Sequence, residues 1–171
     1  LPHGSVEALV VPGLQTGGLD HIAVLGDVGD APLDLLLLVA QATQGLLRQG
    51  SGTVRGPGGI GKTPVAVAVA MRLRADQGLR VAFVDLGRLT PGGPIDAAVE
   101  AAIRDAWPMP SGQGATDAPI LLLLDNCEPV VDAAAVFAER RVFTTDTTHV
   151  LATSREPLRA RGEWVHRLQP L

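Results

Sequence analysis

Short, fully apolar runs alternate along this chain with longer segments in which apolar residues recur every three or four positions. Apolar runs of about four to eight residues are typical of strands that are buried on both faces, as in a parallel sheet. Such runs predict strands at residues 81–86, at residues 119–125 (PILLLLD) and at residues 149–153, with a further short strand at residues 164–168. These strands suit the interior of one sheet.

Helical spacing fills the intervals between these strands. Residues 33–48 (LDLLLLVAQATQGLLR) and residues 95–106 repeat apolar residues at helical spacing, and residues 129–138 predict a shorter helix. Residues 63–74 are almost uninterrupted Val and Ala, so we expect a buried helix there, with Pro64 tolerated in its first turn. The alternation of strands and helices predicts an α/β fold with a parallel sheet and helices on both faces, a three-layer αβα arrangement.

The first residues are less informative than the rest. Apolar stretches at residues 6–11 and 21–25 each suit a strand, and residues 111–118 form a polar, glycine-containing loop. We divide the chain into an N-terminal segment, residues 1–52, and a main domain, residues 53–171. Because the sequence begins with Leu rather than Met, we expect a piece of a longer or processed chain whose C-terminal end is truncated.

Composition sets the kind of core that this sheet can have. Apolar residues make up 46% of the 171 residues, but aromatic residues make up only 3%, and there is no tyrosine. The core must therefore be built from Leu, Val, Ile and Ala. A chain of this length can bury one core and is too short for two ordinary domains.

Charge and cysteine content exclude several classes of protein. A net charge of −4 gives no sign of a basic surface for nucleic acid. The lone cysteine, Cys127, excludes an intramolecular disulfide framework and is expected to pack as a small apolar residue, and the four histidines show no metal-ligand spacing with it. No apolar run reaches the length of a membrane span, and the N-terminus lacks the basic region of a signal peptide. We expect a cytoplasmic protein without a membrane partner and without direct nucleic-acid binding by this segment.

One glycine-rich stretch carries candidate chemistry. Residues 56–63 read GPGGIGKT and satisfy the pattern G-x-x-x-x-G-K-[ST] that wraps the phosphates of a nucleotide. Residues 50–52 are expected to form a turn, and residues 53–55 a short strand that leads into this loop. Backbone N–H groups in such a loop converge on an anion, and the absence of side chains lets the phosphate approach. The predicted phosphate-binding residues are Gly56, Pro57, Gly58, Gly59, Ile60, Gly61, Lys62 and Thr63.

Lys62 is the only lysine among fourteen basic residues. Its compact ammonium is expected to be exposed at the loop and to neutralise phosphate charge, a role that the planar fork of arginine does not fill. The Thr63 hydroxyl can ligate Mg²⁺, and the N-terminus of the following helix adds the positive end of its dipole. Three sources of positive potential are thus expected at one point.

Asp125 ends the apolar strand of residues 119–125. An acidic residue at the carboxyl end of a buried strand beside the strand that enters the loop can hold Mg²⁺. Capping of the following helix is the other use of an aspartate at this position. Together with a complete phosphate loop upstream, Asp125 favours the metal-holding role.

With these segments placed, the chain resembles a known family over residues 53–171. The segments GPGGIGKT, VAFVDLGRLT, LLLLDNCEPV and VLATSREPLRARGEWVHRLQPL resemble the nucleotide-binding, NB-ARC-like ATPase domain of bacterial STAND-type signal-transduction ATPases, and especially the modules of transcriptional regulators. The resemblance implies a Walker A loop with Lys62 and Thr63, a Walker B aspartate at Asp125, and a sensor arginine at Arg155 that reads the γ-phosphate. It also implies that the strand of the loop is central, with the Walker B strand and a sensor strand beside it.

The function implied is an ATP/ADP-binding regulatory switch that uses Mg²⁺ and works with other domains of a longer regulator. Hydrolysis is expected to be slow at most, because Asn126 follows Asp125 where many related ATPases place a general base. Glu128 is the only carboxylate expected nearby, in a position that suits helix capping. A small P-loop kinase or other phosphotransferase, and an inactive truncated fragment, are the alternatives.

Overall fold

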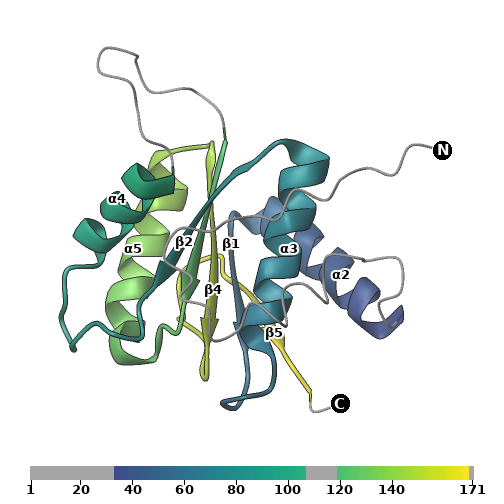
Figure 1. The fold of residues 1–171 in the computed structure, drawn as a ribbon, viewed down its shortest axis with the longest axis horizontal. Coiled ribbons are helices and arrows are strands. Elements are labelled where there is room, and N and C mark those ends of the chain that lie inside the picture. The colour runs from purple at the N-terminus through teal and green to yellow at the C-terminus, as the bar shows by residue number, and fades with distance from the viewer. Residues whose placement is uncertain (1–32, 107–118, 170–171) are drawn as a thin grey trace.

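A computed structural model describes residues 33–106 and 119–169 of this chain. Its five strands form one parallel sheet, in the order β2-β3-β4-β1-β5. The α/β fold with a parallel sheet and helices on both faces is therefore confirmed (Figure 1). The strands are β1 Ser51–Arg55, β2 Arg80–Asp85, β3 Ile120–Asp125, β4 Thr148–Ser154 and β5 Trp164–Arg167.

Four α-helices and one short 3₁₀ helix surround the sheet in the part of the chain that the structure describes. Helices α2 and α3 cover one face, and α4 and α5 cover the other (Figure 1). None of the described helices combines the length and apolar character that a membrane span needs. The helices are α2 Leu33–Gln49, α3 Lys62–Gln77, α4 Ile95–Ala106, the 3₁₀ helix η2 Glu128–Val130, and α5 Val131–Thr144.

The apolar run of β3 illustrates how both faces of the sheet are buried. Leu121 and Leu123 pack into the core under α2 and α3, whereas Leu122 and Leu124 pack into the core under α4 and α5. Because successive strand residues point to opposite faces, only a continuous apolar run can fill both cores. Helix α3 is buried as its Val and Ala content predicts, with Val65, Val69 and other residues in the first core.

Strand β1 is longer than predicted. Residues 50–52 were expected to form a turn, but Ser51 and Gly52 belong to the strand and pair with β4. A Cβ at Gly52 would lie 3.3 Å from the Trp164 ring and 3.5 Å from Leu46, so the neighbours leave little room for a side chain. The strand is buried without being apolar, and hydropathy alone does not reveal it. The predicted division between residues 52 and 53 falls inside β1.

The order of the strands also differs from the expectation. Strand β4 lies between β1 and β3, so the strand that ends in Asp125 does not neighbour the strand that enters the loop. The predicted sensor strand is β4, which ends just before Arg155, and it does lie beside β1. Crossover connections allow a later strand to insert between two earlier ones, so chain order does not fix spatial order.

Other boundaries shift, and some predictions lie outside the described residues. Helix α5 begins at Val131 and continues to Thr144, beyond the predicted residues 129–138. The guanidinium of Arg141 lies 5.3 Å from the centroid of the Phe137 ring, one helical turn earlier, so this charged residue packs along α5. The predicted strands at residues 6–11 and 21–25, and the loop at residues 111–118, lie outside the described residues.

Candidate functional site

The glycine-rich loop leaves the carboxyl end of β1 and enters α3 at Lys62. Gly59 has a φ of 75° and Gly61, the residue before the helix, a φ of 97°. Residues with a side chain rarely adopt these left-handed backbone conformations, so glycine is needed at both positions. The N-terminus of α3 opens onto a cavity of about 890 Å³, lined by Gly58, Gly59, Gly61, Lys62 and Thr63 among others.

Lys62 is buried, with 8% of its surface exposed, which corrects the expectation of an exposed side chain. Its ammonium donates a hydrogen bond of 2.9 Å to the carbonyl oxygen of Pro57, five residues earlier in the same loop. That bond gives the buried charge one hydrogen-bond acceptor inside the loop. The side chain still lines the cavity at the N-terminus of α3.

Three side chains meet at one carboxylate oxygen behind the loop. The Thr63 hydroxyl donates a hydrogen bond of 2.7 Å to Asp125 Oδ1, and the Thr153 hydroxyl donates one of 2.5 Å to the same atom. Although β4 separates β3 from β1, the first residues of α3 reach across it to Asp125. The structure therefore brings together the two residues predicted to hold Mg²⁺.

Sequence reasoning missed Thr153. This fully buried residue on β4 also accepts a hydrogen bond of 3.0 Å from the backbone N–H of Asn126, and its carbonyl accepts one from Cys127. A threonine directly after the apolar residues 150–152 of a buried strand is the signal that could have found it, because a buried hydroxyl needs a partner. Thr153 fixes both the carboxylate and the turn that follows it.

Burial has the largest effect on the pKa of the Asp125 carboxyl. The residue is 4% exposed, and this desolvation raises the pKa of its carboxyl, against the lowering effect of the hydrogen bonds from Thr153 and Thr63. The nearby carboxylates of Asp85 and Glu128 raise the pKa further. A divalent cation at this point would offset the cost of the buried negative charge.

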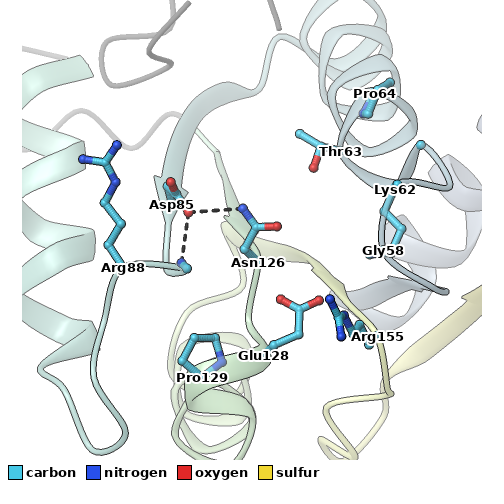
Figure 2. Close-up of a pocket in the computed structure, with 13 residues that line it drawn as sticks. Gly58, Lys62, Thr63, Pro64, Asp85, Arg88, Asn126, Glu128, Pro129 and Arg155 are labelled. Carbon is cyan, nitrogen blue, oxygen red and sulfur yellow. Dashed lines mark hydrogen bonds between the residues drawn. The ribbon is translucent and has the colours of Figure 1, made fainter. Parts of the chain in front are cut away.

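Arg155 follows β4 and reaches back over the glycine-rich loop. A Cβ at Gly58 would lie 3.3 Å from Arg155 Nη2, so the guanidinium covers this loop residue. The side chain is exposed and lines the same cavity as Lys62 (Figure 2). The predicted sensor arginine thus shares one cavity with five of the eight predicted phosphate-binding residues, whereas Gly56, Pro57 and Ile60 do not line it.

The far wall of the cavity holds residues that the sequence analysis did not single out. Asp85 ends β2 in register with Asp125, and its Oδ1 accepts hydrogen bonds from the Gly87 backbone N–H at 2.9 Å and from Asn126 Nδ2 at 3.3 Å (Figure 2). Arg88 also lines this wall. An aspartate at the end of an apolar strand is the same signal that identified Asp125, so Asp85 was detectable. Its presence corrects the expectation that Glu128 is the only carboxylate nearby.

Cys127 is fully buried in the core under α4 and α5, as predicted, and burial raises the pKa of its thiol. Burial lowers the pKa of His149 and of His166. Among residues 33–106 and 119–169, no group of three or more His, Cys, Asp or Glu residues could by itself hold a metal ion. An Mg²⁺ ion here would therefore depend on Thr63, Asp125 and oxygen ligands from a bound nucleotide. Mg²⁺ usually binds through one or two protein groups plus phosphates, so the residues present fit.

No family model matches the chain. Over 119 residues it is 34% identical to "Putative HTH-type transcriptional regulator Rv0890c" from Mycobacterium tuberculosis and to its counterpart Mb0914c from Mycobacterium bovis. The match takes in 65% of this chain and only 13% of either relative. It is also 27% identical over 127 residues to "Uncharacterized protein Rv0894" from Mycobacterium tuberculosis, covering 70% of this chain and 32% of that protein. The chain spans a small part of each relative.

Proposed function

We propose that this chain is an ATP/ADP-binding regulatory switch domain that uses Mg²⁺ and hydrolyses ATP slowly. The observation that carries the proposal is the single cavity lined by Lys62, Thr63 and Arg155, which opens at the N-terminus of α3. Backbone N–H groups, a helix dipole, an ammonium and a guanidinium all favour a polyphosphate there.

The proposed switch depends on where two of the cations that line the cavity, Lys62 and Arg155, lie. Lys62 is held inside the loop by Pro57, whereas Arg155 approaches the loop from the end of β4. A phosphate chain in the loop would meet Lys62 first, and a terminal phosphate would be needed to engage Arg155. A ligand shifts an equilibrium only through its differential affinity for the two states, and a cation that contacts ATP but not ADP supplies such a difference.

The relatives support a regulatory setting. Two proteins that match at 34% identity are named as HTH-type transcriptional regulators and are much longer than this chain. We infer that the domain belongs to a regulator of that kind and works with its other domains. The STAND-type, NB-ARC-like assignment rests on the quoted motifs and is part of this proposal.

Equilibrium titration with ATP and ADP, with and without Mg²⁺, tests the proposal. We expect both nucleotides to bind, ATP more tightly when Mg²⁺ is present, and steady-state turnover to fall below the roughly 1 to 100 per second that is typical of kinases. Absence of binding in the folded chain would contradict the proposal. Turnover at kinase-like rates would instead favour a phosphotransferase.

Asp125→Asn is expected to separate metal binding from stability. The pKa of Asp125 is raised in the folded state, so its ionised form lowers the stability of the fold at any pH above the pKa of the unfolded state. At neutral pH the uncharged amide should therefore raise the thermal midpoint of the nucleotide-free protein. The same change should remove most of the Mg²⁺-dependent gain in ATP affinity and spare binding in EDTA.

Calorimetry and thermal unfolding measure the two effects of Asp125→Asn. Asp146→Asn is the matched control, because Asp146 is exposed before β4, at the opposite edge of the sheet. Equal loss of affinity with and without Mg²⁺ would assign Asp125 a structural role.

A further inference from the structure

The segment that follows β3 sends three consecutive side chains in three directions. Asn126 has a φ of 56° and donates to Asp85 at the far wall of the cavity. Cys127 turns into the core under α4 and α5. Glu128 begins η2 and lines the cavity. The left-handed turn at Asn126 therefore brings a carboxylate to the cavity two residues later than the position directly after Asp125.

Glu128 does not cap a helix, which was its expected use. No side-chain hydrogen bond caps η2 or α5, and the Glu128 carboxylate makes no hydrogen bond within the part of the chain that the structure describes. Figure 2 shows this carboxylate directed toward the side of the cavity on which Arg155 and Gly58 lie. A half-buried carboxylate that faces a cation-lined cavity and has no partner is available to a ligand.

The two other carboxylates in this region, Asp125 and Asp85, each accept hydrogen bonds at Oδ1. Asp125 Oδ1 accepts two hydroxyl hydrogen bonds and lies behind the loop, and Asp85 Oδ1 accepts two hydrogen bonds at the far wall. Strand order places Asp85 three strands from β1, whereas Glu128 faces the side that the loop and Arg155 line. Glu128 is therefore the carboxylate best placed toward the end of a phosphate chain bound in the loop.

We propose that Glu128 is the catalytic carboxylate of this site, which orients the water that attacks the γ-phosphorus and takes its proton. This inference rests on the proposed nucleotide-binding function and assigns the role that Asn126 cannot fill. The water oxygen forms a bond to phosphorus, and the bond between phosphorus and the β–γ bridging oxygen breaks, with its electron pair leaving on ADP. The proton that water loses passes to Glu128 and then to solvent.

The test compares Glu128→Gln with Glu156→Gln and Asp85→Asn in the whole chain. Glu156 follows Arg155 but is exposed and does not line the cavity, so it controls for the loss of one negative charge nearby. Single-turnover hydrolysis of ATP and equilibrium binding of a non-hydrolysable ATP analogue are measured on each variant with Mg²⁺. General-base catalysis contributes about 10² to 10⁴ in rate, so we expect Glu128→Gln to lose that factor.

Binding provides the second readout. Glu128→Gln should bind the analogue as tightly as wild type or more tightly, because the change removes a negative charge that faces the phosphates. Glu128→Asp, which keeps the carboxylate but shortens its reach, should hydrolyse ATP at an intermediate rate. The control Glu156→Gln should match wild type in both measurements.

Three results would overturn the assignment to Glu128 while leaving nucleotide binding in place. They are an unchanged rate in Glu128→Gln, a loss of rate confined to Asp85→Asn, and a wild-type chain that binds the analogue but does not hydrolyse ATP. A wild-type chain that binds neither ATP nor the analogue would overturn the proposed function itself, and this inference with it.

Discussion

Lys62→Ala is expected to abolish measurable binding of both ATP and ADP, a loss of at least about a hundredfold in affinity. Charge-assisted hydrogen bonds contribute roughly 1.5 to 3 kcal/mol each, and the Lys62 ammonium is directed at phosphates that both nucleotides share. Thermal stability should change little. The lost hydrogen bond leaves only the Pro57 carbonyl without its partner, and Pro57 is exposed to water.

Two matched variants sharpen the Lys62 experiment. Lys62→Arg keeps the charge, but its fork is too broad for a position enclosed by the loop, so we expect it to bind nucleotide weakly. Arg74→Ala removes one positive charge from the exposed opposite end of α3 and should bind as wild type does. Calorimetry on the three folded proteins decides the matter, and unchanged ATP affinity in Lys62→Ala would remove the phosphate-binding role from the loop.

Arg155→Ala should weaken binding of an ATP analogue about tenfold to a hundredfold and leave ADP binding nearly unchanged. The reason is the proposed sensor role, in which Arg155 engages the terminal phosphate that ATP has and ADP lacks. Its guanidinium lies over Gly58 of the loop and lines the same cavity, which is where such a contact would form. Arg155→Lys should recover part of the loss, since one ammonium cannot reproduce two parallel hydrogen bonds.

Paired titrations with ADP and a non-hydrolysable ATP analogue at one Mg²⁺ concentration measure the Arg155 effect. Arg161→Ala is the control, because Arg161 is exposed six residues later and does not line the cavity. Equal losses for ADP and the ATP analogue would give Arg155 a structural role and contradict the switch. Equal affinity of wild type and Arg155→Ala for both nucleotides would place Arg155 on the surface without function.

The sequence predicted most of the strands and helices because their buried residues are apolar and follow the spacing of a buried strand or of a helix. Apolar runs marked β2, β3 and β4, and helical spacing marked α2 and α4. Strand β1 was the exception, since close packing by Trp164 and Leu46 selects for a small residue at Gly52. The buried position of Gly52 requires a small side chain and not an apolar one, so a prediction based on hydropathy misses the first residues of β1.

The candidate site was predictable where a motif carries it and unpredictable where tertiary contacts carry it. The pattern in residues 56–63 located Lys62 and Thr63, which do line one cavity. That Lys62 is enclosed depends on its bond to the Pro57 carbonyl. That Thr153 holds Asp125 depends on the placement of β4, and that Glu128 turns into the cavity depends on the left-handed turn at Asn126. None of these contacts follows from the motif alone.

The enclosed lysine gives the molecule a chemical property that follows from the bond between Lys62 and Pro57. Lys62 is the only side-chain amine in the chain, so an acylating reagent has one lysine to modify. Its Nζ donates a hydrogen bond to the loop carbonyl in a residue that is 8% exposed, and a hydrogen-bonded, largely buried amine is a poor nucleophile. Acylation at Lys62 requires the amine to release the Pro57 carbonyl. The rate of acylation at this one residue, located by mass spectrometry of its peptide, therefore reports how often the loop carbonyl and the lysine separate.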